Sequence, residues 1–170
     1  MHVSVMPAKS LDLLAVRPDG IYLDATAGLG GHTALIAERL TTGYRNARRL
    51  IPADWAMATP EERHELRSLV VIHRYQMELI EPLWPRFGRM WIGEAERLRD
   101  RLGRCQDLEV LTRLTGPHQP LAHWRSRLAS ACADRTNDLV HRARRIAVRL
   151  FAERPKAFRQ RLESLWENGH

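Results

Sequence analysis

The sequence predicts a mainly α-helical protein, an antiparallel helical bundle preceded by a short N-terminal α-β-α segment. Apolar residues recur at three- and four-residue steps through most of residues 44–170. Proline and glycine divide these stretches into lengths that are typical of bundle helices joined by short loops. No strand pattern follows Ala25. We therefore expect two units, a leader segment at 1–43 and a helical domain at 44–170.

The leader segment carries the strand pattern of the chain. We expect a short helix at 11–16, a buried strand at 21–25 and, after a glycine loop, a helix at 32–40 that stops near Gly43. A strand followed by a glycine loop and a helix brings backbone N–H groups against an anionic cofactor. Many α/β proteins also use such glycines only for close packing.

The clearest helix of the second unit is centred on the stretch 64–85; residues 59–62 open it, and Pro82 and Pro85 end it. Thr59 is a suitable N-cap, Pro60 fits the first helical position, and Glu62 suits the positive end of the helix dipole. Its core-facing stripe is expected to consist of Leu66, Leu69, Val70, His73, Met77 and Ile80. A second face carries His64, Arg67, Val71, Arg74 and Glu78. We expect His73 to be a core histidine with one satisfied nitrogen.

The other helices follow from the same pattern. Gly103 is expected to stop one of them, and 116–120 is expected to be a loop. The predicted helical stretches are 44–51, 91–102, 106–111, 121–151 and 156–166.

Positive charge belongs to the helical unit. Of 27 basic and 20 acidic residues, only three basic and four acidic ones lie in 1–43. Lys9 and Lys156 are the only lysines, so nearly all of the charge is arginine. Codon usage in a GC-rich genome explains part of this bias, but the planar guanidinium also suits phosphate oxygens. The composition favours a polyanionic partner.

Several classes of function lack their sequence signals. Cys105 and Cys132 have neither metal-ligand nor redox spacing, and two cysteines suit a reducing cytosol. No His-Glu-x-x-His motif and no nucleophile elbow occur. No apolar run approaches the ~20 residues that span a bilayer. We expect a cytoplasmic protein without a metal site, a membrane contact or catalytic residues, and a binding protein in preference to an enzyme.

Three motifs, HELRSLVVIHRYQMELIEPLWP, RLRDRLGRCQDLEVL and FAERPKAFRQRLESLW, occur in an order that resembles the conserved-histidine α-helical domain, or CHAD, family. The resemblance covers 44–167 and is closest to the C-terminal half of that domain. It implies that Asp107 acts as a cap and packing residue at a helix junction. It also implies that the first helical half of the domain is missing. Whether two chains associate to replace that half is left open by the sequence.

His64, Arg67 and Arg74 match basic positions of the family, whereas Ser68 and Val71 stand where it has lysine-type residues. The resemblance implies non-catalytic binding of inorganic polyphosphate by a basic helical face. Carried over to this sequence, the binding residues are Arg45, Arg48, Arg49, His64, Arg67, Arg74, Lys156 and Arg159. Nonspecific RNA binding by the same basic bundle is a second alternative.

The leader, HVSVMPAKSLDLLAVRPDGIYLDATAGLGGHTALIAERL, resembles the start of the S-adenosylmethionine-dependent methyltransferases of small-subunit ribosomal RNA. That resemblance implies cofactor contacts at Gly30, Gly31 and His32. It ends at about Gly43, before the second strand that would complete the cofactor crevice. We therefore expect a fusion of two unlike pieces and an inactive methyltransferase fragment, with no bound cofactor. Binding of S-adenosylmethionine belongs only to this alternative.

Overall fold

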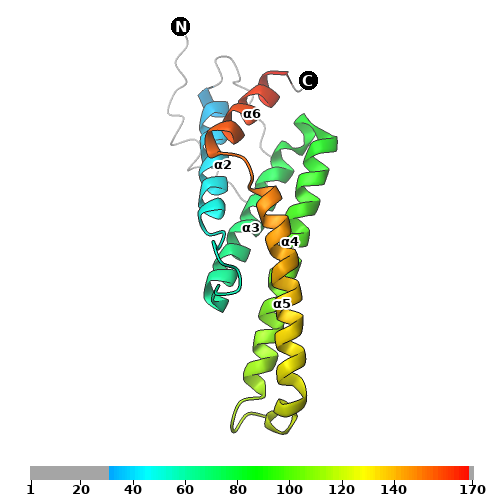
Figure 1. Cartoon of the computed structure of the whole chain (residues 1–170). Coiled ribbons are helices and arrows are strands. Elements are labelled where there is room, and N and C mark those ends of the chain that lie inside the picture. Colours follow the sequence, from blue (N-terminus) through cyan, green and yellow to red (C-terminus); the bar gives the residue numbers. More distant parts are fainter. Residues whose placement is uncertain (1–30, 169–170) are drawn as a thin grey trace.

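The computed structural model describes residues 31–168, which form an all-helical structure (Figure 1). No strand occurs in this range, so the mainly α prediction is confirmed. The expected helix at 11–16, the strand at 21–25 and Gly30 lie outside the described residues. The elements are α2 (Gly31–Arg49), α3 (Pro60–Ile80), η1 (Glu81–Leu83), α4 (Pro85–Leu114), η2 (Ala122–Trp124), α5 (Arg125–Leu150) and α6 (Pro155–Asn168).

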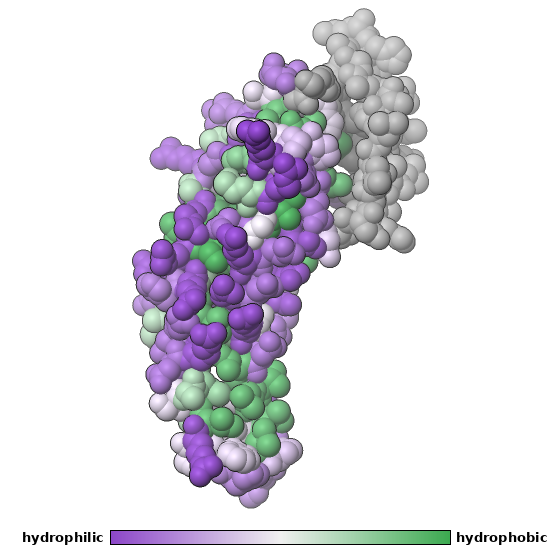
Figure 2. Space-filling model, turned by 90° about the vertical axis from the view of Figure 1, so that its right-hand side faces the viewer, coloured by the Kyte–Doolittle hydropathy of each residue, from purple (hydrophilic) through white to green (hydrophobic). Residues whose placement is uncertain are grey.

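The long helices α4 and α5 form an antiparallel hairpin whose tip extends away from the other helices (Figure 1). α3 packs against α4, and α2 contacts both α3 and α6. Hydrophilic residues cover the middle of the face shown in Figure 2, and apolar residues gather at the hairpin tip. Val110, Leu114 and Trp124, all near that tip, are among the exposed large apolar residues.

The start and the core face of α3 agree with the sequence prediction. Thr59 is the N-cap, and its side chain accepts a hydrogen bond from the Glu62 backbone N–H. The Glu62 carboxylate in turn accepts one from the Thr59 N–H, which completes a capping box with Pro60 in the first turn. Leu69 is only partly buried. The buried residues of α3 are Leu66, Val70, His73, Met77 and Ile80.

The predicted break at Gly43 is wrong, because α2 is one helix that runs through it. A Cβ atom at Gly43 would lie 2.6 Å from the Gln76 side-chain oxygen. Glycine therefore lets α2 approach α3 closely and does not end the helix. The helix crosses the expected boundary between 43 and 44, and Ala37 and Leu40 on its leader side are buried in the core.

The predicted stop at Gly103 is also wrong. α4 is a single helix of 30 residues that runs through Gly103, and the Arg67 side chain lies against this glycine. Asp107 therefore does not cap a helix junction as expected, because it is an exposed residue inside α4. By contrast, α5 and α6 confirm the predicted helices at 121–151 and 156–166 to within a few residues.

An aromatic cluster joins α2, α3, α4 and α6. Tyr44 stacks on Phe158 with ring centroids 4.1 Å apart, and the buried His73 ring contacts Tyr44, Trp91 and Phe151. Burial, with help from the nearby positive charge of Arg161, lowers the pKa of His73 to about 3. The core position of His73 is confirmed. The expected hydrogen bond is not, because neither ring nitrogen has a partner among the described residues.

Candidate polyanion-binding site

The predicted second face of α3 lies along α4. The His64 Nδ1 atom is 3.3 Å from Gln106 Oε1, and Arg74 Nη1 is 3.9 Å from Glu96 Oε1. Between these two contacts, Arg67 lies against Gly103. As residue numbers rise along α3 they fall along α4, so the helices are antiparallel and their register is fixed.

A polar groove of about 390 Å³ opens where Arg67 meets α4. Its formal charge is one positive, from three arginines and two aspartates. His64 contacts Gln106, which lines the groove, so His64 lies beside the groove. The residues that line it are Arg67, Arg99, Asp100, Gly103, Arg104, Gln106 and Asp107.

Two arginines of the groove have no acidic partner within the described part of the chain. The Arg67 side chain is half-buried, and its Nε–H is buried without a hydrogen-bond acceptor in residues 31–168. Arg104 is exposed and forms no ion pair with any residue of that range. Arg99 differs, because its guanidinium donates to Asp100 at 2.7 Å, a hydrogen bond that raises the pKa of Arg99. A buried donor without a partner calls for an acceptor beyond residues 31–168.

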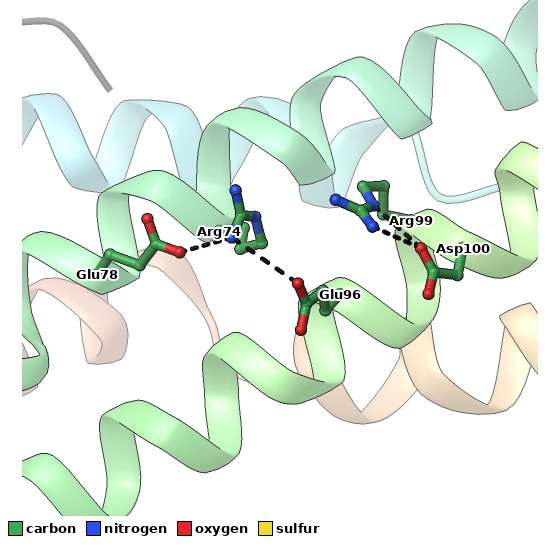
Figure 3. Close-up of polar contacts among 5 residues, drawn as sticks. All are labelled: Arg74, Glu78, Glu96, Arg99 and Asp100. Carbon is green, nitrogen blue, oxygen red and sulfur yellow. Dashed lines mark hydrogen bonds and ion pairs between the residues drawn. The ribbon is translucent and has the colours of Figure 1, made fainter. Parts of the chain in front are cut away.

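Arg74 is the third basic residue on the second face of α3, and carboxylates already balance its charge (Figure 3). Its guanidinium donates to Glu78 at 2.6 Å, lies 3.9 Å from Glu96, and covers the Tyr75 ring at 4.2 Å. Only 14% of its side chain is exposed. The Arg74 Nε–H, like that of Arg67, is buried without an acceptor among the described residues. What distinguishes Arg74 is its two glutamate neighbours, so the second face of α3 is divided into a cationic part around Arg67 and a charge-balanced part around Arg74.

A second concentration of basic charge lies where α2 meets the segment between α5 and α6. The Arg48 Nε–H donates to the Phe151 carbonyl at 3.0 Å, and the Tyr44 hydroxyl donates to the Glu153 carbonyl at 3.1 Å. These bonds bring the second half of α2 beside the start of α6. We call this group the α2–α6 cluster; it consists of Arg45, Arg48, Arg49, Arg154 and Lys156, all exposed and without an ion pair over residues 31–168.

Arg159 serves the fold. It donates to Glu38 on α2 at 2.7 Å and to Glu163 on α6 at 2.8 Å. The bond to Glu163 is the largest of the effects that raise the pKa of Arg159. Arg159 therefore clamps α6 to α2 with a charge that is already balanced.

The suggested cofactor loop is only partly described. Gly31 and His32 form the first turn of α2, and Gly30 precedes the described residues. No strand adjoins this turn in the described structure. No group of three or more metal-ligating side chains occurs within residues 31–168, and none of the helices there is long and apolar enough to cross a membrane. Cys105 and Cys132 are buried free thiols.

Sequence reasoning missed Arg99, Arg104 and Gln106. They belong to α4, which was expected to break at Gly103 and so to lose its common face. Had the helix been continued, Arg99, Gly103 and Gln106 would have fallen at i, i+4 and i+7, the spacing of one helical face. That spacing was the available signal.

Comparison with known proteins gives two findings. The profile of the CHAD domain family matches residues 10–115. Partial matches occur to proteins called ribosomal RNA small subunit methyltransferase H. The one from Solibacter usitatus is 72% identical over 43 residues, which are 25% of this chain and 15% of that protein. The one from Francisella tularensis subsp. novicida is 40% identical over 76 residues, 43% of this chain and 23% of that protein.

A third such protein, from Pseudoalteromonas atlantica, is 52% identical over 44 residues, 26% of this chain and 14% of that protein. The chain thus spans less than a quarter of the length of these curated relatives. No solved structure matches it. Both expected resemblances are confirmed, although the family match begins and ends earlier than the expected 44–167. Because that match covers more than half of the residues, the chain belongs to the CHAD domain family.

Proposed function

We propose that this protein binds inorganic polyphosphate without catalysis, through the α3–α4 groove. The observation that carries the proposal is the pair Arg67 and Arg104, two arginines in one groove with no carboxylate partner in the described chain. Membership of the CHAD family supports it, because polyphosphate binding is what that resemblance implies.

The chemistry of the groove fits a flexible polyphosphate chain. Arg67 and Arg104 offer N–H donors that match phosphate oxygens, and the Gln106 amide adds a neutral donor. Asp100 is held by Arg99, so its charge is compensated. Asp107 has no such partner in residues 31–168 and limits how much negative charge the groove accepts. The groove can therefore hold a few phosphates, while the rest of the ligand continues along the surface.

The α2–α6 cluster contributes attraction at longer range. Its five cations are exposed, so each is worth little at high salt, where the Debye length falls to about 3 Å at 1 M. At low salt they raise the local concentration of any polyanion and release counterions on binding. We assign directional contacts to Arg67 and Arg104, and salt-sensitive attraction to Arg45, Arg49 and Lys156.

The methyltransferase fragment is the second candidate, favoured by 72% identity over 43 residues. A crevice for S-adenosylmethionine needs a neighbouring strand, and none lies within residues 31–168. We therefore propose that the fragment does not bind this cofactor. Nonspecific RNA binding is a third candidate, resting on the same basic charge as the polyphosphate proposal.

One experiment separates these candidates. Fluorescently labelled polyphosphate is titrated with the protein and competed with unlabelled polyphosphate, with single-stranded RNA of equal charge, and with S-adenosylmethionine. We expect polyphosphate to compete best, RNA weakly and S-adenosylmethionine not at all.

Arg104→Glu and Arg113→Glu form a matched pair for the same assay. Both arginines are exposed on α4, but Arg113 lies outside the groove and 3.7 Å from Glu109. Arg104→Glu should weaken binding at least fivefold, about 1 kcal/mol, and Arg113→Glu less than twofold. Equal losses in the two variants, or equal competition by RNA, would contradict the proposal.

A further inference from the structure

A second cavity, of about 590 Å³, lies between the first half of α4, the end of α5 and α6. Its apolar wall is formed by Phe87, Met90, Trp91 and Leu150. It is separate from the α3–α4 groove. Glu94, which lines the cavity, is nine residues before Gly103, which lines the groove. Nine residues are about two and a half turns of helix, so the two sites open on opposite faces of α4.

Buried polar atoms without hydrogen bonds concentrate at this cavity. The Trp91 side chain is 94% buried, since only 6% is exposed, and its Nε1–H has no acceptor among the described residues. The Nε and Nη2 atoms of Arg161 and the Oε2 atom of Glu153 are likewise buried without one. Arg161 Nη2 and Glu153 Oε2 lie 2.6 Å apart and attract as charges, but they are not aligned for a hydrogen bond. The Trp91 Nε1–H and the Arg161 Nε–H are therefore the two buried donors here that the described residues leave without an acceptor.

Arg161 lies among three aromatic rings. Its guanidinium carbon is 4.2 Å from the centre of the Trp91 ring, 4.8 Å from that of Phe87 and 5.6 Å from that of Phe158. Burial lowers the pKa of Arg161, while Glu153 acts in the opposite direction. The wall thus offers stacking surfaces beside a cation whose donors are not used up.

The mouth of the cavity carries a charged rim. Glu94 accepts hydrogen bonds from Arg97 at 2.7 Å and from Arg149 at 2.8 Å. Burial opposes ionisation of Glu94, but these two bonds outweigh it and lower its pKa. The lining therefore has three arginines against the two carboxylates of Glu94 and Glu153, which leaves one positive charge without a counterion.

We propose that this cavity binds a small organic monoanion with a flat, apolar body. The body would pack against Phe87, Met90 and Trp91, and a carboxylate would accept hydrogen bonds from the Trp91 Nε1–H and the Arg161 guanidinium. One negative charge balances the lining. The volume falls within the range of about 300–1,000 Å³ that is usual for small-molecule sites. Polyphosphate does not fit this description, since it carries about one charge per phosphate and has no apolar body.

Three probes with one ring system and different charge test the proposal: indole-3-acetate, the neutral indole-3-acetamide and the cationic tryptamine. Each is titrated into ¹⁵N-labelled protein, and the indole N–H signal of Trp91, assigned by its loss in Trp91→Phe, is followed. We expect indole-3-acetate to shift this signal with a dissociation constant on the order of 1 mM or below. The amide should bind about tenfold more weakly and tryptamine should not bind.

Two exposed positions on α4 provide the matched variants. Met90 lines the cavity and is 59% exposed, whereas Val110 is 46% exposed and lies outside it. Met90→Glu should weaken indole-3-acetate at least tenfold through repulsion at the mouth, and Val110→Glu should leave it unchanged. The proposal is overturned if no probe gives a saturable shift up to about 10 mM, ten times the expected constant. It is also overturned if tryptamine binds as well as indole-3-acetate, or if the two variants behave alike.

Discussion

Replacing Gly103 by alanine should raise stability and weaken polyphosphate binding at the same time. A Cβ atom there would lie 3.3 Å from Arg67 Nε, slightly closer than the ordinary contact distance of about 3.5–4.0 Å. Arg67 must therefore move by a few tenths of an ångström. The move costs the fold little, because its Nε–H has no hydrogen bond to the described residues that could be lost. Alanine in a helix interior is favoured over glycine by about 0.5–1 kcal/mol. We expect Gly103→Ala to raise the free energy of unfolding by slightly less than this helix preference.

Binding should respond in the opposite direction, because charge-assisted hydrogen bonds depend closely on donor position. A three- to tenfold loss of polyphosphate affinity, about 0.6–1.4 kcal/mol, is expected for Gly103→Ala. Chemical denaturation measures the stability, and fluorescence anisotropy with labelled polyphosphate measures the binding.

Two other glycines of α4 serve as controls. A Cβ atom at Gly93 would meet nothing within 4 Å, so Gly93→Ala should stabilise without changing the binding. A Cβ atom at Gly88 would lie 2.8 Å from the Glu81 Cα atom, which is backbone and cannot move aside. Gly88→Ala should destabilise by about 1–3 kcal/mol. If Gly103→Ala binds polyphosphate like Gly93→Ala, the position of Arg67 does not matter and the reasoning fails.

Three further predictions concern Arg74, His73 and Leu40. Arg74→Gln should weaken polyphosphate binding less than twofold in the anisotropy assay, because Glu78 and Glu96 already balance the charge of Arg74. Arg67→Gln should weaken it about tenfold. Equal losses would contradict the distinction between these two arginines. The folded-state pKa of His73, about 3, is below the unfolded value of about 6.5, so its contribution to stability is present above pH 6.5 and is lost as the pH falls toward 3. Denaturation from pH 7 to 4 should show an extra loss of up to about 1.4 kcal/mol per pH unit that His73→Phe removes, and identical pH profiles would refute it. Leu40→Ala should cost about 2–4 kcal/mol by denaturation if α2 belongs to the core on its leader side as well, whereas a cost below about 0.5 kcal/mol would show that it does not.

Local signals in the sequence were enough for some elements. The capping box of Thr59 and Glu62 and the stripe from Leu66 to Ile80 involve residues a few positions apart, so α3 could be predicted from them. The turn at 116–120 and the start of α6 near Pro155 were marked in the same local way.

Gly43 and Gly103 could not be interpreted from local signals. A glycine that stops a helix and one that admits a neighbouring side chain look alike until the partner is known. Here the partners are Gln76 and Arg67, far away in sequence. The two false breaks hid both the continuity of α2 and the common face of α4.

The candidate site was predictable on α3 and hidden on α4. His64 and Arg67 share a helical face, which the spacing shows. Whether an arginine on that face is free depends on what α4 places opposite it. Arg74 meets Glu96 and Arg67 meets Gly103, and only the register between the two helices decides this.

The salt dependence of polyphosphate binding tests the central claim most directly, because its slope counts phosphate contacts. The logarithm of the binding constant is measured against the logarithm of salt concentration for the wild type and for the double variant Arg67→Gln/Arg104→Gln. The control is Arg113→Gln/Arg135→Gln, whose arginines are exposed and lie near Glu109 and Asp138. At roughly 0.7 per phosphate contact on a single strand, the groove variant should lose about 1.4 from the slope and the control almost nothing. An unchanged slope in the groove variant would show that Arg67 and Arg104 do not hold the polyphosphate.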